Sequence, residues 1–238
     1  MCLDIENIDR MDADALSELA FHFENRKEYD KAALCLTKAA ELGDKLATFY
    51  IAQYYEKGQG VAQDYEKAAV LYMEVSACNE PLVFADPTEP LTPQCDAEYA
   101  LGSFYEKGLL PDSTIEKAAQ WYARAAADGH ADAYFKMAEL HFLGHGVAQS
   151  VHEAVRYLCD GYYWSRGGDE RYFTLAQALV GKVSGYDQIS ILKMLGDFYT
   201  KGLGVEKDAD KASDYYAEAN RLTAEENAKI QSYIGNLL

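Results

Sequence analysis

Proline, cysteine and basic residues are scarce in this chain of 238 residues, and each shortage excludes something. Of the five prolines, three stand close together at Pro87, Pro90 and Pro93, so helix is permitted almost everywhere else. The five cysteines share no spacing and form no C-x-x-C motif, which argues against a disulfide framework and against a zinc site. The 22 Lys and Arg against 39 Asp and Glu leave a formal net charge of −17, which argues against the basic face that nucleic acid requires.

Long apolar runs are missing as well. The first residues, Met1-Cys-Leu-Asp-Ile-Glu6, lack the basic segment and apolar run of a signal peptide, and no stretch has the length and apolar character of a membrane span. The acidic charge also argues against an anionic membrane surface. We therefore expect a cytoplasmic protein with no membrane and no nucleic-acid partner. The excess of acidic residues either keeps the protein soluble or attracts a basic partner.

What the chain does contain is a glycine motif that occurs four times. In its fullest form the motif reads Tyr55-Glu-Lys-Gly58-Gln-Gly60-Val61, and Lys67-Ala-Ala69 follows. In every copy the step from the first glycine to the following Lys or Glu is nine residues, and such a fixed interval is typical of a repeat protein. The glycines and their Lys or Glu partners are Gly58 and Lys67, Gly108 and Lys117, Gly144 and Glu153, and Gly202 and Lys211.

Each copy predicts two helices joined by a turn. Before the glycines, Ala47, Ile51 and Tyr55 have the i, i+4, i+8 spacing of one helix face. Gly58 is expected to end that helix, because glycine readily takes the left-handed conformation at a helix carboxyl end. Asp64 is then a suitable N-cap for a second helix, which contains small alanines and a bulky tyrosine at position 72, 122 or 216.

The repeats are unevenly spaced. The first helices open at Ala15, Ala47, Ala97, Ala133 and Ile191. The steps are 32, 50, 36 and 58 residues, so a period of 36 leaves insertions of 14 and 22 residues in the two long steps. The first insertion holds the prolines and predicts a loop, whereas residues 169–180 in the second predict an extra helix. Thr223-Ala-Glu-Glu226 resembles a capping box and predicts a final helix.

One copy is especially regular. It contains Ala97-Glu-Tyr-Ala-Leu101-Gly102-Ser-Phe-Tyr105, then Lys117-Ala-Ala-Gln-Trp121-Tyr122 and Ala125-Ala-Ala-Asp-Gly129. This pattern resembles the SEL-one-like repeat (SLR) family, a branch of the tetratricopeptide-type α-solenoids, and the resemblance runs from about Ala13 to Leu222. The family implies an all-α fold: a right-handed α-solenoid of about five helix-turn-helix repeats, plus an extra inserted helix and a C-terminal capping helix.

We expect a single repeat domain over residues 1–238. Its five units are predicted at residues 13–44, 45–79, 96–130, 131–163 and 188–222. The insertions are predicted at about residues 80–95 and 164–187, and the cap at residues 224–237.

No catalytic, cofactor or metal site is predicted. The Gly-x-Gly strings are interpreted as turns and not as phosphate loops, since no predicted strand precedes them and the Lys-Ser/Thr of a P-loop is missing. His141 and His145 are four residues apart, but Gly144 separates them and there is no H-E-x-x-H motif. No G-x-S-x-G or comparable nucleophile motif occurs, so we do not expect an enzyme.

The resemblance to tetratricopeptide repeats implies that the first helix of each unit lines a concave groove. By register, Phe49, Tyr99 and Phe135 occupy one position in three units and would form an aromatic row flanked by carboxylates. Such a row would suit a peptide with apolar anchors and Lys or Arg between them, whereas the alternative is that these rings pack between repeats. The residues predicted to contact the partner are Phe49, Gln53, Glu56, Asp96, Tyr99, Ser103, Glu106, Asp132, Phe135, Glu139, Phe142 and Asp197, with Lys193 beside them.

We therefore expect a non-catalytic scaffold or adaptor that binds a protein or peptide in its concave groove. An alternative is a small-ligand binder or enzyme whose site is formed by the insertion at residues 161–187, where Tyr162-Tyr-Trp-Ser-Arg166 is rich in aromatic side chains. A third interpretation is self-association through the open solenoid ends or the proline-rich loop, although a monomer is favoured.

Overall fold

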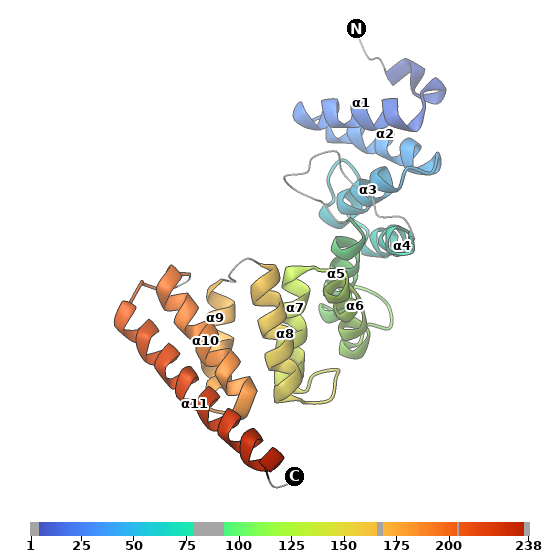
Figure 1. Ribbon diagram of the computed structural model, residues 1–238. Coiled ribbons are helices and arrows are strands. Elements are labelled where there is room, and N and C mark those ends of the chain that lie inside the picture. The colour runs from blue at the N-terminus through green and yellow to red at the C-terminus, as the bar shows by residue number, and fades with distance from the viewer. Residues whose placement is uncertain (1–4, 79–92, 166–168, 204, 236–238) are drawn as a thin grey trace. The chain divides into compact units, whose positions relative to one another are not determined.

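The computed structural model describes residues 5–78, 93–165, 169–203 and 205–235 (Figure 1). Regular structure in these ranges is entirely helical, with eleven α-helices and one 3-10 helix and no strand. The chain divides into two compact units, Met1–Asp128 (unit 1) and Gly129–Leu238 (unit 2). The all-α prediction is confirmed.

Unit 1 consists of three successive helix pairs, as the repeats predict. Within each pair the two helices are joined by a short turn and pack along one another. The pairs are α1 (Ala13–Asn25) with α2 (Tyr29–Glu41), α3 (Lys45–Lys57) with α4 (Tyr65–Ser76), and α5 (Pro93–Glu106) with α6 (Ile115–Ala127), preceded by the 3-10 helix η1 (Ile5–Arg10).

The glycine motif forms the turns within pairs. Gly58 ends α3 in the left-handed region at φ 65°, and Gly144 and Gly202 end their helices in the same way at φ 73°. The Asp64 carboxylate accepts a hydrogen bond of 3.0 Å from the backbone N–H of Lys67 and so caps α4. Both roles follow from local chemistry, because glycine pays no Cβ penalty at positive φ and a carboxylate satisfies an unpaired N–H.

The first insertion lies outside the described residues, apart from its end. Helix α5 begins at Pro93, inside the range predicted as a loop. Proline is tolerated in the first turn of a helix because its missing N–H has no partner there, so Pro93 starts this helix and does not exclude it.

Unit 2 holds two repeat-type pairs and the extra helix. Helix α9 confirms the helix predicted in the second insertion, and the Asp169 carboxylate caps it through the N–H of Arg171 at 2.8 Å. The helices are α7 (Ala131–Leu143), α8 (Val151–Trp164), α9 (Glu170–Val180), α10 (Gly185–Lys201) and α11 (Ala209–Gly235).

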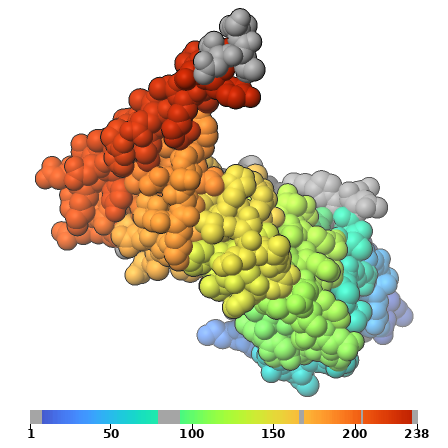
Figure 2. Space-filling model, turned by 90° about the horizontal axis from the view of Figure 1, so that it is seen from below, coloured from blue at the N-terminus to red at the C-terminus, as the bar shows by residue number. Residues whose placement is uncertain are grey.

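The predicted final helix exists, but it continues α11 without a break. The hydroxyl of Thr223 donates to the carbonyl of Ala219, four residues earlier, and so acts within the helix and not as an N-cap. The last turns of α11 extend beyond the neighbouring helices of unit 2 (Figure 2) and expose Ile230, Tyr233 and Ile234.

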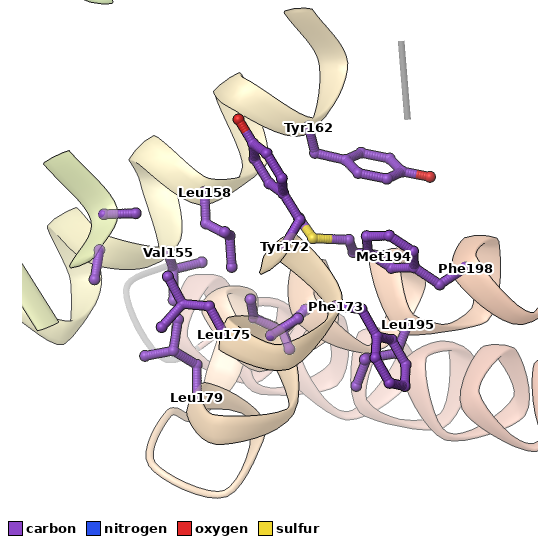
Figure 3. Packing of buried hydrophobic residues seen from close by; sticks show 14 residues of the cluster. Val155, Leu158, Tyr162, Tyr172, Phe173, Leu175, Leu179, Met194, Leu195 and Phe198 are labelled. Atoms are coloured by element: carbon purple, nitrogen blue, oxygen red, sulfur yellow. The ribbon is translucent and has the colours of Figure 1, made fainter. Parts of the chain in front are cut away.

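Within each unit, the cores join neighbouring helix pairs. In unit 1, Tyr72 and Tyr122 are fully buried, and the ring of Tyr122 lies beside Gly102 of α5. In unit 2, apolar side chains of α8, α9 and α10 converge in one cluster (Figure 3). The inserted helix is therefore part of the core of its unit.

Candidate partner-binding surfaces

The predicted aromatic row begins with Phe49, and the structure corrects this residue. Its side chain is 3% exposed and packs against the rings of Tyr50 and Tyr72, at centroid distances of 5.8 and 5.9 Å. Phe49 is a core residue between repeats because its position on α3 faces neighbouring helices. A partner has no access to it in this conformation.

The other first-helix positions of unit 1 remain partly accessible. Gln53, Asp96, Tyr99 and Ser103 are all half-buried. The ring of Tyr99 lies 5.4 Å from that of Tyr122, so one side of Tyr99 packs within the repeat.

Two predicted carboxylates in unit 1 are held by tyrosines of the second helices. The hydroxyl of Tyr72 donates to Glu56, and that of Tyr122 donates to Glu106, both at 2.6 Å. Burial raises the pKa of both tyrosines, so the hydroxyls stay protonated and donate. Glu56 and Glu106 are themselves half-buried, so these bonds fix two partly exposed carboxylates at the same register.

Asp197 in unit 2 repeats this arrangement. It accepts hydrogen bonds from Tyr216 at 2.5 Å and from Tyr162 at 3.1 Å. A tyrosine of the second helix thus holds a carboxylate of the first helix in three repeats, although Asp197 lies three residues earlier in its repeat than Glu56 and Glu106 do in theirs. For Glu56 and Glu106 the sequence carried the signal as a Tyr 16 residues later.

Helix α9 and the turn after it cover the predicted positions on α7. The Arg171 guanidinium pairs with Asp132 at 2.6 Å and lies 5.2 Å from the centre of the Phe135 ring, which also packs on Tyr172. The ammonium group of Lys182 lies 4.3 Å from the ring centre of Phe142. The second insertion thus supplies contacts to all three residues, which are half-buried.

Glu139, the fourth predicted residue on α7, is half-buried, and its carboxylate lies 3.5 Å from the ammonium group of Lys136.

A hollow in unit 1 contains none of the predicted residues. It has a volume of about 540 Å³ and lies between the second helices α2 and α4, with α3 between them. Sequence reasoning missed it because it examined the first helices only. Its lining includes Ala40, Ile51, Tyr55, Val70 and Leu71.

A second hollow, of about 210 Å³, lies between α8 and α10 in unit 2. Tyr162 and Tyr163 line it from the predicted insertion, with Lys193 and Asp197 opposite on α10. Small-molecule sites usually measure about 300–1,000 Å³. The volume therefore does not favour the alternative of a ligand site at residues 161–187. Trp164 of the same segment is 62% exposed and does not line this hollow.

His141, on the last turn of α7, packs against α8. His141 stacks on the ring of Tyr157 at 5.5 Å, and its Nδ1 lies 3.2 Å from the carbonyl oxygen of Ala148. Within the described ranges, no three His, Cys, Asp or Glu side chains gather as metal ligands would. In the same ranges, no helix combines the length and apolar character needed to cross a membrane.

Comparison with known proteins agrees with this architecture. The model of the Sel1 repeat matches five segments of the chain, at residues 13–44, 45–79, 95–130, 131–159 and 192–222. An uncharacterized protein of Neisseria meningitidis serogroup B is 26% identical over 216 residues, which cover 85% of this chain and 41% of that protein.

Two solved structures share the fold. One is c5321, a protective antigen present in uropathogenic Escherichia coli strains that displays an SLR fold, with a TM-score of 0.55 at 21% identity over 89% of this chain and 46% of its own. The other is a Sel1 repeat protein from Oxalobacter formigenes, with a TM-score of 0.55 at 22% identity over 86% of this chain and 84% of its own. This chain thus spans less than half the length of the Neisseria and E. coli proteins. Five matched repeats covering most of its residues show that the chain belongs to the Sel1 repeat family.

Proposed function

We propose that this chain is a non-catalytic scaffold that holds a protein or peptide partner on the first-helix face of its repeats. Sel1 repeat proteins are generally interaction scaffolds. The observation that carries the proposal is the pair of carboxylates, Glu56 on α3 and Glu106 on α5, each fixed by a buried tyrosine at 2.6 Å. Groups held in place before binding lose little entropy when a partner arrives.

The chemistry of this face favours a basic partner with apolar anchors. Glu56, Asp96 and Glu106 supply negative charge on α3 and α5, and half-buried Tyr99 supplies an aromatic edge. The formal net charge of −17 would also speed association with a basic partner. We propose a cytoplasmic monomer, for which the free thiols of Cys35, Cys78, Cys95 and Cys159 are the supporting observation.

Affinity purification from the native host tests this function with two matched variants. Gln53→Arg places a positive charge on the first-helix face, whereas Gln120→Arg makes the same change at an exposed position of the second helix α6. We expect wild type and Gln120→Arg to recover the same partner and Gln53→Arg to lose it. Equal recovery by both variants would show that the binding face is assigned wrongly. If wild type enriches no protein above an empty column, the scaffold function itself is refuted.

A further inference from the structure

The hollow between α2 and α4 is an apolar site with an acidic rim. Ile51 and Tyr55 of α3 line it together with Ala40 of α2 and with Val70 and Leu71 of α4. The side chain of Val70 is 63% exposed. An apolar side chain from another molecule that entered here would remove this surface from water.

The charges around the hollow are mostly negative. Glu41, Glu66 and Glu74 line it, with Lys67 as the one cation among the lining residues. Glu74 pairs with Lys45, but neither Glu41 nor Glu66 forms an ion pair with a residue that the structure describes. Both of these carboxylates are exposed.

Lys67 does not neutralise this rim. Its ammonium group lies 3.3 Å from the Asp64 carboxylate and 5.4 Å from the centre of the Tyr55 ring. Lys67 is therefore paired with a carboxylate that does not line the hollow.

The next seam of the same unit, which is the contact region of α4, α5 and α6, shows which side chains fill the space equivalent to the hollow. Fifty residues further along, where α4, α5 and α6 meet, Glu98 replaces Thr48, Trp121 replaces Leu71 and Arg124 replaces Glu74. The Arg124 guanidinium lies 4.6 Å from the centre of the Trp121 ring and 2.9 Å from the Glu98 carboxylate. It also donates to the hydroxyl of Ser76 at 3.0 Å. In that seam the chain therefore supplies its own aromatic ring and its own guanidinium.

We propose that the hollow between α2 and α4 takes a segment of a protein partner that carries a large apolar side chain and, about one helical turn away, an arginine. The apolar side chain occupies the space that small Leu71 and Ala40 leave, and the guanidinium pairs with Glu41 or Glu66. Arginine suits this role because its planar fork binds carboxylates with two hydrogen bonds. The proposal rests on the proposed scaffold function and adds a second surface to it, on the second-helix side.

The probe is an acetylated and amidated hexapeptide, Ala-Trp-Ala-Ala-Arg-Ala, which carries the Trp–Arg spacing of α6. It is titrated into the ¹⁵N-labelled full chain and followed by amide chemical shifts. We expect shifts confined to the lining segments of α2, α3 and α4. A matched peptide with Glu in place of Arg is expected to bind about tenfold more weakly, because its carboxylate would meet the acidic rim.

Protein variants locate the site. Glu66→Lys should weaken binding of the Trp–Arg peptide about tenfold, whereas Glu116→Lys, the same change at the equivalent position of the filled seam, should leave it unchanged. Leu71→Trp should abolish binding by filling the hollow, and the equivalent position 121 already accommodates Trp. Circular dichroism spectra of Glu66→Lys and Leu71→Trp that match wild type exclude misfolding as the reason for their weaker peptide binding.

Three outcomes overturn the proposal. The first is an absence of shifts in the lining segments at millimolar peptide, and the second is equal binding of the Arg and Glu peptides. The third is a dimer by light scattering that Leu71→Trp converts to a monomer, since a second copy would then be the occupant. If one of these three results is found while wild type still recovers its partner by affinity purification, the hollow is refuted and the scaffold function stands.

Discussion

Removal of one hydroxyl tests whether the tyrosine–carboxylate bonds hold the repeats together. Tyr122→Phe deletes the donor of the 2.6 Å bond to Glu106 and leaves the buried ring in place, so no cavity forms. A hydrogen bond to a charged acceptor contributes about 1.5–3 kcal/mol to stability. Because Glu106 is half-buried, water can replace the lost donor, and we expect the lower end of that range.

The expected loss is therefore about 1.5 kcal/mol, or about 3–6 °C in Tm for a chain of this length. Urea unfolding followed by circular dichroism measures it as a lower midpoint at constant m-value. The preceding repeat offers a replicate, because Tyr72→Phe deletes the equivalent bond to Glu56. Tyr105→Phe is the control: its hydroxyl forms no hydrogen bond with a described residue, and we expect a change within about 0.5 kcal/mol.

A double-mutant cycle decides the cause. If the bond stabilises the fold, Tyr122→Phe and Glu106→Ala should be non-additive, with a coupling energy of about 1 kcal/mol. Additivity within about 0.3 kcal/mol would refute the reasoning, since the two groups would then contribute independently.

Three further predictions concern packing and pH. Gly102→Ala adds a methyl group 2.6 Å from the buried ring of Tyr122, and this overpacking should lower the free energy of unfolding by about 1–3 kcal/mol. The higher helix propensity of Ala offsets about 1 kcal/mol of that loss, and urea unfolding measures the net change. Burial raises the pKa of Glu98, so wild type loses stability as pH rises from the ordinary Glu pKa of about 4.3 through the raised value, and Glu98→Gln should gain stability relative to wild type over that range. The hydrogen bond to Asp187 raises the pKa of His152, so the pair stabilises below the ordinary pKa of about 6.5 and is lost as pH rises through the raised value. An NMR titration should show this raised pKa in wild type and an ordinary one in Asp187→Asn.

Each of these has a control or a contrary result. Gly181→Ala, where a Cβ meets nothing within 4 Å, should not destabilise the fold. The Glu98 argument fails if Glu98→Gln and wild type respond identically to pH. The His152 argument fails if Asp187→Asn leaves its pKa unchanged.

Local features of the fold were predictable because their causes are local. The left-handed turn at Gly58 and the cap at Asp64 depend on a few neighbouring residues, and both were read from spacing alone. The same logic located α9. The prediction of a helix start at Thr223 was wrong, because a Ser/Thr-x-x-Glu pattern also occurs inside a helix. There the hydroxyl donates a hydrogen bond to the carbonyl four residues earlier.

The candidate surfaces were predicted less well, because exposure depends on what packs on each position. Register correctly identified Glu56 and Glu106 as equivalent, and each has a Tyr 16 residues later. That spacing alone does not form the hydrogen bonds, which exist because the two helices of a pair pack together. Phe49 and Phe135 share one register position but have different neighbours: helices of the repeats surround the first, and the inserted helix covers the second.

The sequence by itself therefore determined the repeat, the helix pairs, the turns between them and the family. These follow from helical periodicity and capping, which act over a few residues. Only the tertiary structure decided which surfaces are open. Leu71 and Thr48 line the hollow between α2 and α4, and the equivalent positions one repeat later hold the larger Trp121 and Glu98. That difference acquires meaning only when helices distant in sequence pack together, since packing density depends on the side chains that meet in space.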